Sequence, residues 1–84
     1  MDSKHHKILE SIFEKPECSN IAWRDIEALF NALGAEITEG RGSRMRIYLN
    51  GVKAVFHRPH PRKEANKSTV KSVRRFLEKA GMKP

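Results

Sequence analysis

The chain has little with which to cross-link itself or enter a membrane. It contains one cysteine, Cys18, in 84 residues, and one cysteine forms neither an internal disulfide nor a cysteine-cluster zinc site. No apolar run approaches the roughly 20 residues that span a bilayer, and the first ten residues lack the apolar segment of a secretion signal. We therefore expect a cytoplasmic protein with no membrane partner, whose core is held by packing alone.

Acidic residues are few relative to basic ones. Lys and Arg number 17 against 10 Asp and Glu, so the formal net charge is +7. Such an excess points to a polyanion, with RNA or DNA ahead of an acidic protein or a membrane surface. The length excludes two domains, so residues 1–84 are expected to form one. The four histidines and the cysteine do not have the spacing of a zinc site, and we expect no metal and no cofactor.

Apolar residues recur at three- and four-residue spacing in three stretches, which predicts helices over residues 4–14, 23–33 and 68–80. Gly34 and Gly81 stand where helices commonly end in a left-handed conformation. The first helix is expected to pack through Ile8 and Phe13, either on the core of the same chain or on a second copy. The predicted aromatic core residues are Trp23, Phe30, Phe56 and Phe76.

Between the second and third helices the apolar period changes to two. This pattern predicts strands over residues 35–39, 43–49 and 52–57. Gly40-Arg41-Gly42 and Asn50-Gly51 are typical hairpin turns. The expected fold class is α+β, with the order α-α-β-β-β-α and a three-stranded antiparallel sheet packed on helices.

Turn length fixes which residues face each other across a hairpin. Both turns place apolar residues on one face of the sheet and polar residues on the other. The predicted cross-strand pairs are Arg44 with His57 and Met45 with Phe56 across the second turn, and Thr38 with Arg44 and Ile37 with Met45 across the first. The polar face is then predicted to carry Arg44, Arg46, Tyr48, Lys53 and His57.

This polar face combines cations for phosphates, a ring for stacking and an imidazole that exchanges protons near neutral pH. RNA transesterification needs a base, an acid and a cation that holds the phosphate, and His57 opposite Arg44 supplies two of these roles. A solvated face of a basic protein is the alternative, because cationic side chains also keep a sheet soluble.

Two further regions are candidates for phosphate contacts. The start of the last helix offers free backbone N–H groups beside Lys67 and Lys71. In the first turn, glycines allow the backbone at Arg41 and Ser43 to approach a phosphate closely. The alternative for the helix, which also carries Arg74, Arg75 and Lys79, is an ordinary solvated charged face.

A family resemblance covers residues 21–84. It lies in Leu33-Gly34-Ala35 at a helix end, the turn Gly40-Arg41-Gly42-Ser43, Pro59-His60, and the stretch from Ser68-Thr69-Val70 to Ala80-Gly81-Met82. In order and spacing this pattern resembles the HicA toxins, small mRNA interferases with a double-stranded-RNA-binding-like fold. The resemblance implies an RNA substrate and a HicB-type antitoxin that covers the RNA-cleaving surface. The helix at 4–14 lies outside this family core.

One departure from the family pattern bears on catalysis. The catalytic histidine of the family follows the Gly-Ser pair directly, whereas Arg44 follows Gly42-Ser43 here. His60 matches a second histidine that members often carry and is assigned to RNA binding. As a hypothesis, His57 takes the place of the missing group, with Arg44 as phosphate clamp.

Two alternatives stay open beside this hypothesis: an RNA-binding module without cleavage, and an interaction protein whose basic face serves an acidic partner. DNA binding ranks lower, because no helix-turn-helix pair is recognisable.

Overall fold

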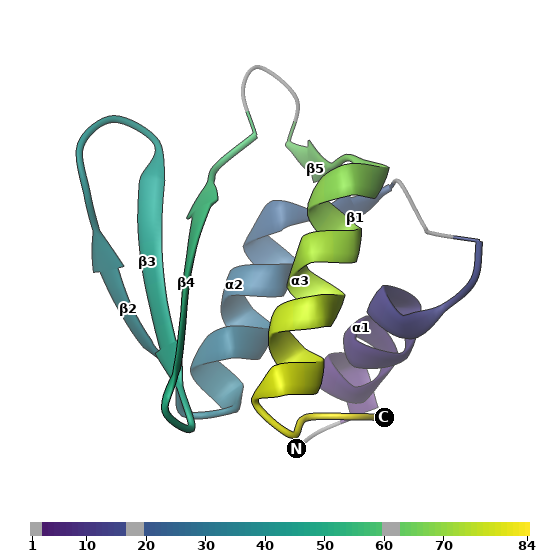
Figure 1. The fold of residues 1–84 in the computed structure, drawn as a ribbon. Helices are drawn as coiled ribbons and strands as arrows, with labels where there is room; N and C mark the ends of the chain where they lie inside the picture. Colours follow the sequence, from purple (N-terminus) through teal and green to yellow (C-terminus); the bar gives the residue numbers. More distant parts are fainter. Residues whose placement is uncertain (1–2, 17–19, 60–62) are drawn as a thin grey trace.

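The chain folds into three layers, described for residues 3–16, 20–59 and 63–84 of a computed structural model (Figure 1). An antiparallel sheet forms the first layer, two helices cover one of its faces, and a third helix lies on the far side of that pair. The helices are α1 (Ser3–Phe13), α2 (Trp23–Ala32) and α3 (Lys67–Lys79), and the sheet strands are β2 (Glu36–Glu39), β3 (Arg44–Leu49) and β4 (Val52–His57).

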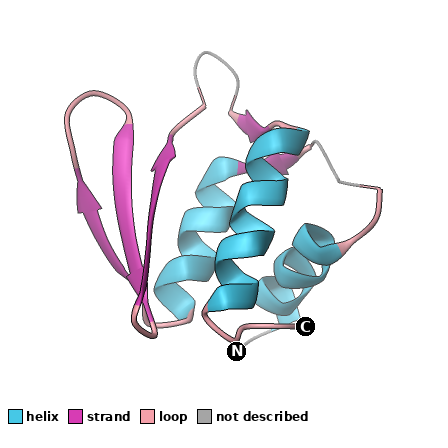
Figure 2. Cartoon of the chain, viewed as in Figure 1, coloured by secondary structure: helices cyan, strands magenta, loops and turns pink. Residues whose placement is uncertain are grey.

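The predicted α+β class and the order of the main elements are confirmed, and the arrangement is consistent with a double-stranded-RNA-binding-like fold (Figure 2). Where the bounds of these helices and strands differ from the predicted ones, the difference is one residue. Within the three described stretches, no helix is long and apolar enough to cross a membrane.

A second, two-stranded sheet was not predicted. Its strands are β1 (Ile21–Ala22) and β5 (Glu64–Ala65), in which Ile21 pairs with Ala65. The Trp23 N–H extends this pairing by donating to the Lys63 carbonyl at 2.8 Å. This small sheet joins the start of α2 to the segment that leads into α3. Strands of two residues show no alternation, so the sequence pattern gives no signal for them.

The register of β3 against β4 is confirmed in all six predicted pairs, from Arg44 with His57 to Leu49 with Val52. Asn50 and Gly51 both have positive φ, 50° and 81°, as the tight two-residue hairpin turn requires. The Asn50 side chain also donates to the Ala80 carbonyl at 2.8 Å, which ties this turn to the end of α3.

The predicted register of β2 against β3 is wrong by two residues. Thr38 faces Arg46 instead of Arg44, and Ile37 faces Ile47 instead of Met45. The reason is that Gly40 continues the ladder, donating its N–H to the Arg44 carbonyl at 2.8 Å, so the three-residue loop begins one residue later than predicted. Side chains alternate with a period of two, and a shift of two therefore leaves each residue on its predicted face.

The core lies between the sheet and the helices and continues under α1. All four predicted aromatic core residues are buried. Phe56 of β4 packs against Phe30 of α2 and Phe76 of α3, with ring centroids 6.0 and 5.9 Å apart, and Trp23 lies 6.0 Å from Phe56. On the other side of the helix pair, Leu9 and Ile12 are buried and attach α1 to its own chain, and Ile8 and Phe13 are partly buried against the same core.

Arg74 differs from the other cationic residues of α3. The sequence pattern places it on or beside the polar side of the helix, yet only 6% of the residue is exposed. Arg74 follows Val73 and lies one turn after Val70, both of which are fully buried. Because α3 packs against β4 on one flank and α1 on another, it buries a wider stripe than a helix with a single neighbour.

Candidate functional site

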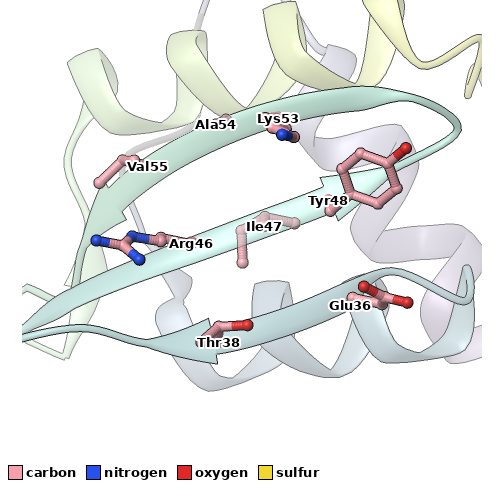
Figure 3. A pocket seen from close by; sticks show the side chains of 8 residues that line it. All are labelled: Glu36, Thr38, Arg46, Ile47, Tyr48, Lys53, Ala54 and Val55. Carbon is pink, nitrogen blue, oxygen red and sulfur yellow. The ribbon is translucent and has the colours of Figure 1, made fainter.

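The uncovered face of the sheet carries the five side chains predicted for it. Arg44, Arg46 and Tyr48 alternate along β3 with buried Met45, Ile47 and Leu49. Lys53 and His57 are exposed on β4. Figure 3 shows Arg46, Tyr48 and Lys53 at neighbouring positions of this surface. The alternation of apolar and polar residues therefore positions these groups, since every apolar residue that enters the core turns its neighbours outward.

An open groove of about 700 Å³ runs over this face and is called the sheet-face groove. Its lining residues come from all three strands and are Glu36, Thr38, Arg46, Ile47, Tyr48, Lys53, Ala54 and Val55 (Figure 3). The sequence reading missed Val55 as part of it. Val55 is 53% exposed and Tyr48 42% exposed, so the groove offers an apolar floor between charged side chains. The signal that could have identified Val55 is an apolar residue at a strand position whose side chain faces outward, opposite Arg46.

Tyr48 and Lys53 form a pair across β3 and β4. They face each other in the register, and the Lys53 ammonium lies 5.8 Å from the centre of the Tyr48 ring. A cation over a ring face is attracted by its quadrupole. One side of the ring is thus occupied by the ammonium group, and an incoming planar group has the other side to stack on.

Arg44 and His57 lie together at the opposite end of the β3–β4 ladder. They are direct cross-strand partners, and facing Cβ atoms in such pairs are about 4.5–5.5 Å apart. The first turn also positions Arg44: a Cβ atom on Gly40 would lie 3.4 Å from the Cβ, Cγ and Cδ atoms of Arg44. The arginine side chain therefore lies against the space that glycine leaves open.

Arg58 is the residue at this end that the sequence reading missed. It follows His57 but contacts groups on the covered side of the sheet. Its guanidinium donates to the Glu27 carboxylate of α2 at 3.0 Å and to the Glu39 carboxylate of β2 at 2.6 Å. Its backbone N–H donates to the Ser43 carbonyl at 2.9 Å. Arg58 thereby joins the end of β4 to the first hairpin and to a helix.

The hydrogen bonds to Glu27 and Glu39 raise the pKa of Arg58 above its already high ordinary value. The pKa in the folded state then exceeds that in the unfolded state. The stabilisation is fully present below the ordinary arginine pKa and is lost only as pH rises through the raised value. Titration of this arginine therefore has no effect in the physiological range.

Replacing Arg58 with alanine is expected to loosen the first hairpin without unfolding the protein. Hydrogen exchange should accelerate a few-fold at the amides of Gly40 and Arg44, because the ion pairs to Glu27 and Glu39 no longer restrain the hairpin. Exchange in α3 should be unchanged. Arg24, an exposed arginine that lines the same small hollow as Arg58, is the matched control, and equal exchange in both alanine variants would contradict the role of Arg58.

The remaining predicted site residues fall elsewhere. Arg41 and Ser43 are exposed in the first turn, next to Arg44. Lys67 and Lys71 are exposed on α3, and α3 packs on the covered side of the sheet (Figure 1). They therefore lie on a different surface from the sheet-face groove. His60 lies outside the described residues.

No three His, Cys, Asp or Glu side chains come together as metal ligands within residues 3–16, 20–59 and 63–84. What the site offers chemically is an open sheet face with arginine, lysine, tyrosine and histidine side chains.

The comparisons with known proteins identify the family. No curated protein and no solved structure matches the chain significantly. The match to the family of the HicA toxin of bacterial toxin-antitoxin systems extends over residues 23–82, from the first residue of α2 to just beyond α3. This match covers well over half of the sequence, and the chain belongs to the HicA toxin family.

Proposed function

We propose that this HicA-family toxin binds RNA on the uncovered face of β2, β3 and β4 and cleaves it at the Arg44–His57 end of that face. The observation that carries the proposal is the gathering of Arg44, Arg46, Lys53 and His57 on one exposed surface. Membership of the HicA toxin family supports the proposal, because the family resemblance implies an RNA substrate and a basic surface would bind RNA.

The composition of the surface fits an extended polymer. In this proposal Arg44, Arg46 and Lys53 contact phosphates, and arginine binds phosphate through paired N–H groups. Tyr48 and Val55 provide apolar area on which bases stack. The sheet-face groove is lined by residues of all three strands, so a polymer lying in it would contact several strands at once.

In the proposed reaction the 2′-oxygen of a ribose attacks the adjacent phosphorus while its proton passes to the imidazole of His57. The bond from phosphorus to the 5′-oxygen breaks, and the leaving oxygen takes a proton from water at this exposed position. The resulting hydroxide is neutralised when His57 releases its proton. The products are a 2′,3′-cyclic phosphate and a 5′-hydroxyl. Arg44 stabilises the additional negative charge on the phosphate oxygens.

A second candidate is RNA binding without cleavage. It is favoured by Arg44, which directly follows Gly42-Ser43, the position where the family resemblance places the catalytic histidine. The binding surface is the same in both candidates, and only the role of His57 differs. Measurement of cleavage by the purified protein separates them.

A toxin of this class has an antitoxin as its partner. We assign the sheet face as the surface that a HicB-like antitoxin covers, since a protein seated there displaces RNA from Arg44, Arg46 and Lys53. Acidic side chains on the antitoxin would meet these cations, and electrostatic complementarity of this kind accelerates association.

Replacing both Arg44 and Arg46 with alanine is expected to weaken RNA binding by at least about tenfold at moderate salt. Two lost phosphate contacts should also reduce the slope of log affinity against log salt by about 1.4 for a single strand. Fluorescence anisotropy of a labelled RNA over a salt series measures both quantities. The matched control replaces Lys7 and Lys83 with alanine. Both residues are exposed, and neither belongs to the sheet. Equal losses in the two variants would reject the sheet face as the binding surface.

A further inference from the structure

A basic hollow lies between the end of α1 and the middle of α3, on the other side of the helix pair from the sheet. Its volume is about 530 Å³, and it is called the α1–α3 hollow. Its lining residues are Phe13, Lys15, Lys71, Arg74, Arg75 and Glu78. It shares no lining residue with the sheet-face groove, and α1 packs on the side of the helix pair opposite the strands (Figure 1).

The sequence brings these residues together in two ways. Lys71, Arg74, Arg75 and Glu78 are spaced by three and four residues and therefore share one face of α3. Lys15 comes from a different element and follows the last residues of α1. Leu9 and Ile12 fix its position indirectly, because they attach α1 to the core.

The charge of the hollow is strongly one-sided. Four cationic side chains and one carboxylate surround it, for a formal charge of +3. Only 6% of Arg74 is exposed, and among the described residues it is the one charged residue that is buried. The fold thus keeps a guanidinium inside a concave surface instead of letting it extend into water. The buried guanidinium adds to the positive potential of the hollow, and this potential attracts an anion.

The positive surface continues beyond the hollow along α3. Lys67, Lys71, Arg75 and Lys79 are all exposed and follow one another at intervals of four residues. At 1.5 Å per residue this line is about 18 Å long. A single carboxylate neutralises one point of such a line, whereas a phosphodiester chain carries repeated charges along it. The arrangement therefore favours a nucleic acid backbone over an acidic side chain.

From these observations we infer that the α1–α3 hollow binds a backbone phosphate of RNA, as a second contact site in addition to the sheet-face groove. The inference rests on the proposed function, namely that the chain binds RNA. Lys15 and Phe13 lie outside the family match at residues 23–82, so part of the site belongs to the segment that precedes the matched residues. RNA that reaches both surfaces is held at two points, and this strengthens binding beyond either contact alone.

The test is charge reversal of Lys15 and Lys71 together, written Lys15→Glu with Lys71→Glu. Both side chains are exposed, so the fold should persist, and thermal unfolding checks this. Anisotropy with a labelled single-stranded RNA should show affinity reduced at least about tenfold and the salt slope reduced by about 1.4. The milder variant, Lys15→Gln with Lys71→Gln, should show the same reduction in slope with a smaller loss of affinity.

The matched control is Lys4→Glu with Lys7→Glu. It makes the same change in net charge on exposed positions of α1, away from the hollow. We expect its affinity to fall by no more than about twofold, because separated surface charges are screened by salt. The inference is overturned, and the proposed function stands, if the hollow variants match this control or lose antitoxin binding instead of RNA binding. If the unmodified protein binds no RNA, the proposed function fails and the inference fails with it.

Discussion

Replacing His57 with alanine should slow RNA cleavage by about 10²- to 10⁴-fold, the usual contribution of a positioned general base. RNA affinity should stay nearly unchanged, because the proposed phosphate contacts of Arg44 and Arg46 do not involve His57. His57 is exposed at the end of β4, and its register partner is Arg44. An alanine there removes the proton acceptor without opening a cavity, so the fold should be unaffected. Single-turnover cleavage of an end-labelled RNA, with protein in excess, measures the chemical step.

Chemical rescue makes this prediction specific. Free imidazole added to the His57→Ala variant should restore part of the lost rate, because it enters the space that the ring vacates and accepts the same proton. His6, exposed on α1 and 3.8 Å from Glu10, provides the matched control, and its alanine variant should cleave at the normal rate.

The possible outcomes separate the two forms of the proposed function. A His57→Ala variant that cleaves as fast as the unmodified protein removes His57 from the mechanism. An unmodified protein that binds RNA and leaves it intact supports the RNA-binding module without cleavage. Arg44→Ala should reduce both affinity and rate, because a phosphate clamp acts in the ground state and in the transition state.

The second large effect is expected in the core. Replacing Phe30 with alanine should lower the free energy of unfolding by about 3–5 kcal/mol, out of the roughly 5–15 kcal/mol typical of a folded domain. Phe30 of α2 is fully buried. Its ring lies 6.0 Å from Phe56 of β4 and 5.8 Å from Phe76 of α3. Its loss leaves a cavity where the helix pair meets the sheet.

Urea unfolding followed by tryptophan fluorescence measures this effect, because the chain has a single tryptophan and Trp23 is buried beside Phe56. Val55 is the matched control: it is apolar but 53% exposed, and Val55→Ala should change stability by no more than about 0.5 kcal/mol. A Phe30→Ala loss as small as that of the control would show that the three rings do not join the sheet to the helices.

The parts of the fold that follow from the sequence are those with a clear period or a specific turn. Asn50-Gly51 permits essentially one tight hairpin, and for this reason every predicted β3–β4 pair is correct. Gly40-Arg41-Gly42 contains two residues that tolerate many conformations, and the loop centre was placed one residue early. The predicted face of each side chain survived this error because the resulting shift is even.

Features that depend on distant residues were not predictable in the same way. Arg58 contacts Glu27 and Glu39, which lie 31 and 19 residues away, and no local pattern marks the three as partners. The burial of Arg74 depends on where α1 packs. The apolar periodicity of α3 gives no information on the position of α1. The predicted site residues fall on two surfaces for the same reason. Lys67 and Lys71 are cationic like Arg44, Arg46 and Lys53, but the topology places them on α3 and not on the sheet.

The alternation along β4 also shapes how this protein can evolve. Phe56 is buried in the aromatic core while its neighbour His57 faces solvent, so a core residue and the proposed general base are adjacent in the chain. Substitutions that repack Phe56 shift the backbone from which His57 projects. With His57 as the proposed general base, drift in the hydrophobic interior would change the cleavage rate without touching any polar residue, and a variant inactivated in this way would keep an intact cationic face.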